Sequence, residues 1–92
     1  MNNAERVNLI STKLQQALSP TVLRVIDDSD QHIGHAGAKS GAGHFTVIIA
    51  SPQFADLPKV ACHRLINQAL EDLFTSEIHA LSIQIVHTNP QS

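Results

Sequence analysis

The sequence predicts a single two-layer α+β domain over residues 1–92, with its elements in the order α-β-β-α-α-β. Three observations support this fold class. Apolar residues recur at helical spacing near the N-terminus and again past the middle of the chain. Three short segments rich in branched apolar residues are typical of strands. The 42% apolar content suffices for one core, so helices are expected to cover one face of a three-stranded mixed sheet.

The first helix is expected to begin near Asn2, which can act as its cap, with Glu5 three residues further on. The Ser19–Pro20 pair should end it, because a residue that precedes proline disfavours the helical conformation. Between these limits the apolar residues have the spacing of one buried helical face, namely Val7, Ile10, Leu14, Ala17 and Leu18.

Two strands follow, over residues 22–26 and 45–50, with a glycine-rich loop between them. In the second strand Phe45, Val47 and Ile49 share one face, which we predict to be the core face. The Ser51–Pro52 pair should end this strand.

A single helical turn is expected over residues 53–56, and a longer helix should open at Leu57–Pro58, since proline is tolerated in a first turn. Its predicted buried stripe is Ile66, Ala69, Leu70 and Leu73. The third strand is predicted over residues 80–86, where Leu81, Ile83 and Ile85 alternate with Ser82 and Gln84.

Strand order predicts which distant residues meet. The first two strands should be antiparallel, whereas a connection through helices normally makes the second and third strands parallel. The starts of these two strands then lie at the same end of the sheet, from which the loop also extends. His44 and His79 mark those starts, and His32 and His35 lie in the loop.

The histidines are the candidate metal ligands, because neutral imidazole binds metals and titrates near neutral pH. Two of them at one sheet edge would supply half of a tetrahedral site, which a partner, small thiols or water must complete. These histidines also have interpretations that involve no metal. His32 and His35 can be solvated loop residues, and His79 can form hydrogen bonds with the backbone. A structural hydrogen bond is favoured for His44, a surface or helix-to-loop role for His63, and solvation for His87. Cys62, on the longer helix, is expected to be a small buried apolar group.

Composition narrows the classes of function. With six Lys and Arg residues and a net charge of −2, the chain does not have the charge of a strongly basic nucleic-acid-binding protein. One cysteine suits a reducing compartment, and neither a signal peptide nor an apolar run of about 20 residues is visible. A cytoplasmic protein without membrane association is therefore expected. No pattern of a nucleophilic triad, paired catalytic carboxylates or a phosphate-binding loop is evident, so we do not expect an enzyme.

The chain resembles the BolA family over nearly its whole length and in the correct order. The matching motifs are Leu18-Ser19-Pro20, Ser29-x-x-His32, His44-Phe45-x-Val47, Ser51-x-x-Phe54, His63-Arg64-Leu65 and Ile78-His79-Ala80-Leu81-x-Ile83. This resemblance implies a fold similar to class II KH domains, with the element order that was predicted above.

The resemblance also implies a function. Members of this family pair with monothiol glutaredoxins around a shared [2Fe-2S] cluster, to which glutaredoxin contributes a cysteine and glutathione a second thiolate. The family's other two ligands correspond to His79 and to a loop histidine. His32 has the matching spacing from Ser29, and His35 is a close rival. No cofactor is expected in the isolated protein.

Some bacterial members regulate transcription by binding DNA. The resemblance therefore implies an alternative function for the helix-turn-helix-like segment 51–73, with Lys59, His63 and Arg64 as partner-binding or double-stranded DNA-binding residues. Family members often have Arg-His-Arg where this chain has Cys62-His63-Arg64, so one positive charge is missing and the DNA-binding interpretation is weakened, although Lys59 and Arg64 remain. A homodimeric interaction domain with incidental histidines is a third interpretation.

Overall fold

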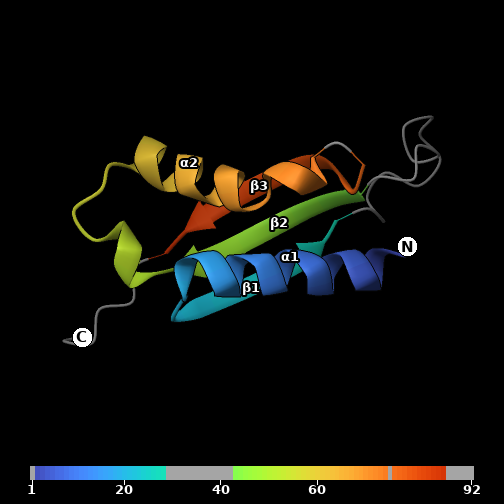
Figure 1. The fold of residues 1–92 in the computed structure, drawn as a ribbon, viewed down its shortest axis with the longest axis horizontal. Helices are drawn as coiled ribbons and strands as arrows, with labels where there is room; N and C mark the ends of the chain where they lie inside the picture. Colours follow the sequence, from blue (N-terminus) through green and yellow to red (C-terminus); the bar gives the residue numbers. More distant parts are fainter. Residues whose placement is uncertain (1, 29–42, 75, 87–92) are drawn as a thin grey trace.

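The computed structural model describes residues 2–28, 43–74 and 76–86. Two α-helices and two short 3-10 turns pack on one side of a three-stranded sheet (Figure 1). The elements are α1 (Asn3–Leu18), β1 (Val22–Asp27), β2 (Gly43–Ala50), η3 (Pro52–Phe54), α2 (Lys59–Ala69), η4 (Glu71–Leu73) and β3 (Ile78–Ile85). The predicted two-layer α+β class and the element order are confirmed, with the 3-10 turn η3 in the place of the short helical turn.

Helix α1 begins and ends as the sequence indicates. The Asn2 side chain accepts a hydrogen bond of 2.8 Å from the Glu5 N–H, so it caps the first turn. At the other end Ser19 adopts a left-handed conformation with φ 45°, and its N–H bonds to the Gln15 oxygen. The Ser51 hydroxyl donates to the Leu18 carbonyl at 2.6 Å. This bond satisfies a carbonyl that has no partner within the helix and joins α1 to the end of β2.

The sheet has the order β1-β2-β3. Strands β1 and β2 are antiparallel, with Val25 opposite Val47, and β2 and β3 are parallel, with Val47 opposite Ile83. The mixed sheet and both predicted strand orientations are confirmed. Strands β2 and β3 each begin two residues earlier than predicted, at Gly43 and Ile78, because their pairing extends to these residues.

The core lies between the sheet and the two helices. From β2 it takes Phe45, Val47 and Ile49, as the strand period predicts. The helical layer contributes the predicted apolar residues Ile10, Leu14, Leu18, Ile66, Leu70 and Leu73. Ala17, which was predicted on the buried face of α1, is exposed, because the neighbouring Leu18 occupies the inward position there. The opposite face of the sheet is not covered by a helix among the described residues, and the side chains of His44, Thr46 and Ile48 there are only half-buried (Figure 1). No helix in the described ranges is long and apolar enough to cross a membrane.

Candidate metal centre

A β-bulge brings His79 to the surface of β3. Opposite β2, Gly43 pairs with Ile78 but His44 pairs with Ala80, so His79 is the extra residue. Ile78 is buried and Leu81 packs against the core, although an uninterrupted strand would turn residues three apart to opposite faces. The bulge absorbs this mismatch, and His79 and Ala80 are both exposed.

The rings of His44 and His79 lie side by side at this end of the sheet. Their centres are 5.0 Å apart, with an angle of 49° between the ring planes. Two imidazoles bound to one tetrahedral metal through metal–nitrogen bonds of about 2.1 Å would have ring centres about 5 Å apart. The pair therefore has a spacing at which both rings can bind one metal ion.

The predicted convergence of His44 and His79 is thus confirmed. A structural hydrogen bond was expected for His44, and the structure also shows a ring contact. Its backbone oxygen accepts a hydrogen bond of 2.8 Å from the Asp28 N–H, while its ring faces that of His79. No group of three or more His, Cys, Asp or Glu side chains able to hold a metal occurs within residues 2–28, 43–74 and 76–86. The described residues provide two imidazoles and leave other ligands to be supplied.

The start of β3 is anchored by an ion pair that the sequence did not reveal. Arg6 Nε donates to Glu77 Oε1 at 2.9 Å, and the Glu77 backbone oxygen accepts from the Gly43 N–H at 3.2 Å. Hydrogen bonds from the Arg6 guanidinium and the Ser76 hydroxyl hold the pKa of the Glu77 carboxyl below its usual value. Glu77 therefore connects α1, β2 and the strand that carries His79.

The remaining predicted ligands, His32 and His35, lie outside the described residues, as does His87. The segment that carries His32 and His35 follows Asp28, the first residue after β1, and leads into β2 at Gly43. Both flanking residues are fixed at the sheet end that bears His79. Asp28 donates to the His44 oxygen through its N–H and accepts a hydrogen bond from the Thr46 hydroxyl through its carboxylate.

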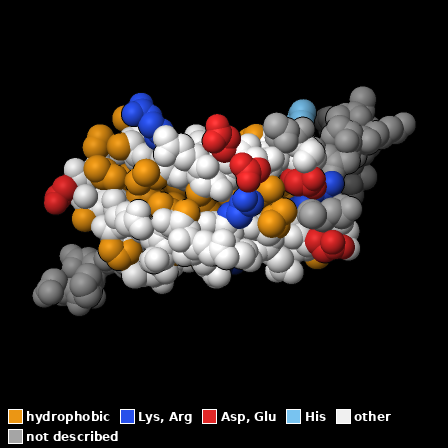
Figure 2. Space-filling model, viewed as in Figure 1, with side chains coloured by type: hydrophobic (Ala, Val, Ile, Leu, Met, Phe, Trp, Pro, Cys, Tyr) orange, Lys and Arg blue, Asp and Glu red, His pale blue; other side chains and the backbone are white. Residues whose placement is uncertain are grey.

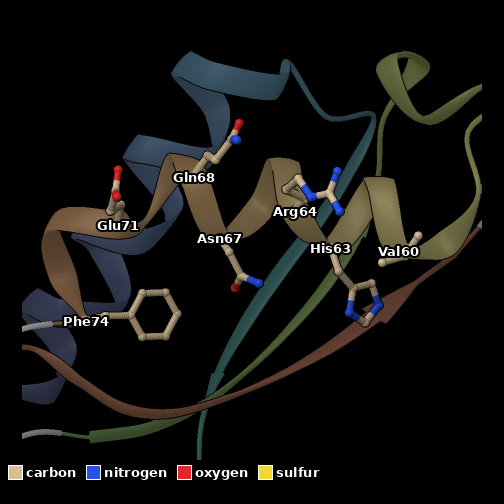
Figure 3. Close-up of a pocket in the computed structure, with 7 residues that line it drawn as sticks. All are labelled: Val60, His63, Arg64, Asn67, Gln68, Glu71 and Phe74. Carbon is tan, nitrogen blue, oxygen red and sulfur yellow. The ribbon is translucent and has the colours of Figure 1, made fainter.

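The predicted partner-binding or DNA-binding residues belong to the helical layer. Lys59, His63 and Arg64 all lie on α2, where Lys59 and Arg64 are exposed and His63 is half-buried. His63 and Arg64 line a surface hollow, which Lys59 does not (Figure 3). The segment 51–73 contains one 3-10 turn and one α-helix of 11 residues followed by a second 3-10 turn, rather than two α-helices.

Cys62 is on the inner side of α2, as predicted. It is 2% exposed, and its sulfur lies 4.0 Å from the Leu57 carbonyl oxygen. This placement suits a small core side chain and gives the thiol no access to the imidazole pair on the other side of the sheet.

Both the sequence and the fold identify the class of protein. The family model described as BolA-like protein matches residues 14–89 of this sequence. The chain belongs to the BolA-like protein family.

Individual relatives agree with this assignment. The DNA-binding transcriptional regulator BolA of Vibrio cholerae serotype O1 is 42% identical over 81 residues, which cover 88% of this chain and 74% of that protein. BolA-like protein 1 of Pongo abelii is 43% identical over 75 residues; the match covers 82% of this chain but only about half of that relative, at 53%. The solved BolA domain of SufE1 from Arabidopsis thaliana superimposes with a TM-score of 0.76 at 40% identity, covering 89% of this chain and 91% of that one.

Proposed function

We propose that this chain is a non-enzymatic adaptor that binds a monothiol glutaredoxin and shares a [2Fe-2S] cluster with it. The observation that carries the proposal is the exposed, bulged His79 beside a second imidazole at the end of the sheet where the histidine-bearing loop is attached. One solved relative is the BolA domain of SufE1 from Arabidopsis thaliana, and this combination with SufE1 supports a role linked to iron–sulfur clusters.

The chemistry of the donor set fits such a cluster. Two histidines can replace two cysteines on one iron of a [2Fe–2S] centre, as in Rieske proteins. In the proposed complex this chain supplies two nitrogen ligands, and a glutaredoxin cysteine and a glutathione thiolate supply the sulfur ligands. The cluster would bring the iron atoms and their redox chemistry. The protein's own part is to hold His79 at the surface, through the bulge and through the anchor at Glu77.

His79 is one ligand in this proposal, and the second is His32 or His35 from the loop. The structure adds His44 as a third candidate, because its ring centre is 5.0 Å from that of His79. The three candidates differ in how they would act. His44 is held in β2, whereas His32 and His35 belong to the segment between Asp28 and Gly43.

The test is to mix this protein with a cluster-loaded monothiol glutaredoxin and glutathione and to record visible circular dichroism, which reports the ligand environment of the cluster. We expect His79→Ala to abolish the spectrum of the mixed complex. One of His32→Ala, His35→Ala and His44→Ala should alter it strongly. Gln84→Ala, exposed further along the same strand, is the matched control and should leave it unchanged. A wild-type spectrum for folded His79→Ala would refute the ligand assignment.

The second candidate function is DNA-binding transcriptional regulation. It is favoured by the name of the Vibrio cholerae relative and by the exposed Lys59 and Arg64 on α2. On the face shown in Figure 2, however, basic side chains are interspersed with acidic ones among the described residues. Glu71 lines the same hollow as Arg64. We therefore place this function second.

Duplex binding titrated against salt tests this alternative. Phosphate contacts release counterions, so binding through Lys59 and Arg64 should weaken steeply as salt rises and should be lost in the double Lys59→Ala, Arg64→Ala variant. The assay is run at one fixed pH well above 7. Absence of duplex binding at low salt would exclude this function.

A further inference from the structure

The outward side of α2 and η4 carries a stripe that the proposed cluster site does not use. Its members recur at three- and four-residue intervals and line a shallow hollow of about 620 Å³ (Figure 3). We call this surface the α2 stripe; it consists of Val60, His63, Arg64, Asn67, Gln68, Glu71 and Phe74.

Exposed apolar groups lie at the two ends of the α2 stripe. Val60 is 64% exposed and Phe74 is 39% exposed, and Leu57 completes the large apolar side chains that are exposed within the described residues. Exposed apolar groups rimmed by polar ones are typical of interaction surfaces. Between these ends the α2 stripe carries one arginine, one glutamate, two amides and one imidazole.

Apart from His63, which has no counterpart, these groups are arranged in complementary pairs about the middle of the α2 stripe. Val60 and Phe74 lie seven residues to either side of Asn67, and Arg64 and Glu71 lie at nearly equal distances from the Asn67–Gln68 pair. A two-fold axis across this point would place apolar ends against apolar ends and each arginine against a glutamate. From this pattern we propose that the α2 stripe binds a second copy of this chain, with the two helices antiparallel.

The side-chain directions agree with a two-fold axis that lies in the interface across the helices. Such an axis makes the two copies of the helix run in opposite directions. Side chains that project to one side of the helix in one copy then face the side chains that project to the same side in the other copy. Figure 3 shows His63, Asn67 and Phe74 projecting to one side of the helix, and Gln68 and Glu71 to the other. Asn67 then meets Asn67 of the partner subunit, and Gln68 meets Gln68 of the partner subunit. Parallel helices would instead place arginine against arginine, which like-charge repulsion disfavours.

Arg64 and Glu71 are available for this contact. Neither forms an ion pair within residues 2–28, 43–74 and 76–86. They lie seven residues apart, Arg64 on α2 and Glu71 in η4, and they do not pair with each other within the described part of the chain. Each can find an opposite charge on a second copy, and the dimer forms this ion pair twice.

The small size of the α2 stripe predicts that two copies of the chain associate weakly. From Val60 to Phe74 it is about 21 Å long, roughly two-thirds of the diameter of a small domain. A single pair of such helices should bury less than the 1,200 Å², about 600 Å² per copy, that is typical of stable complexes. The dimer is therefore weak, with a dissociation constant in the range of about 10 μM to 1 mM.

The test uses the full chain in sedimentation velocity from about 5 μM to 1 mM. Arg64→Glu and Glu71→Arg should each weaken self-association about tenfold or more, because each replaces two attractive contacts with two repulsive ones. The double variant Arg64→Glu, Glu71→Arg should restore it to within about threefold. A mixture of the two single variants should form a heterodimer, since each charge then meets its opposite.

Arg24→Glu is the matched control, because it makes the same charge change on exposed β1 and should leave association unchanged. Val60→Ser removes an exposed apolar group without disturbing the core and should weaken association about threefold to tenfold. Far-UV circular dichroism checks folding. A monomer at every concentration, dimers insensitive to the single variants, or association only after addition of DNA or glutaredoxin would each overturn the proposal.

Discussion

At the end of the sheet that carries His79, the sequence predicted the role of some residues but not the contacts of others. His79 was predicted as a ligand from strand order and family resemblance, and its exposure next to His44 agrees with that role. Arg6 and Glu77 could not be paired in advance, because 71 positions separate them and neither lies in a recognisable motif. Only the completed fold brings the first turn of α1 to the start of β3.

The ion pair between Arg6 and Glu77 predicts that the folding stability of the protein depends on pH. The pKa of Glu77 is lower in the folded protein than the 4.5 of an unperturbed glutamate, because Arg6 and Ser76 donate hydrogen bonds to its ionised form. The unfolded state therefore binds the proton more tightly, so this stabilisation is present above about pH 4.5 and is lost as the pH falls through the folded pKa. We expect Glu77→Gln to be less stable than the wild type at pH 7 and to lose less stability between pH 5 and about pH 3.

Urea denaturation at a series of pH values measures this difference. Glu5→Gln is a suitable control, because the Glu5 backbone rather than its side chain takes part in the cap. Parallel pH profiles for the wild type and Glu77→Gln would contradict the contribution of the ion pair.

His79 itself should contribute little to folding stability. Its side chain is exposed on the bulge, where its described ring contact is with His44. Surface substitutions of this kind usually change stability by less than about 0.5 kcal/mol. We expect His79→Ala to unfold within this margin of the wild type in thermal denaturation, while cluster binding is lost. A large destabilisation would indicate a structural histidine instead of a ligand.

At the scale of elements, periodicity located the helices and strands but not all their limits. The alternation of Phe45, Val47 and Ile49 predicted their burial correctly, since it follows from strand geometry alone. The two extra residues at the start of β2 and β3 had no such signal, and Gly43 argued against a strand. Pairing across the sheet determines these starts, and the bulge at His79 arises from the same pairing.

The N-terminal cap of α1 gives an element-level prediction. Asn2 accepts the hydrogen bond of the Glu5 N–H, so Asn2→Ala leaves that donor without its partner and should destabilise the protein by about 1 kcal/mol. Asn8→Ala makes the same replacement at an exposed position inside the helix, where alanine is the better helix former. We therefore expect a lower Tm for Asn2→Ala and an equal or slightly higher one for Asn8→Ala in calorimetry. Equal losses at both positions would argue against the cap.

At the scale of the whole molecule, connectivity predicted the meeting of His44 and His79, because a crossover through helices makes β2 and β3 parallel. The α2 stripe was not predicted, although its residues are close in sequence. Lys59, His63 and Arg64 were noted there for charge, whereas the matching of Val60 with Phe74 becomes visible only once the exposed side of α2 is known.

The two-layer architecture separates the proposed cluster site from the Val60 end of the proposed dimer surface. His79 is exposed on β3 beside His44 of the open sheet face, whereas Val60 lies on the outward side of α2. Val60 is also at the end of α2 opposite to the one that leads into β3, about 15 Å along the helix axis from Leu70. Substitutions at sites this far apart without shared partners usually have independent effects.

We therefore expect His79→Ala to leave the dissociation constant of the dimer within about twofold of the wild type, and Val60→Ser to leave the visible circular dichroism of the glutaredoxin complex unchanged. Sedimentation velocity and cluster titration on the same two variants measure both effects. If Val60→Ser instead changes the cluster spectrum, the α2 stripe contacts glutaredoxin. If His79→Ala changes self-association, the dimer includes the sheet edge, and the two surfaces must then be treated as a single interface.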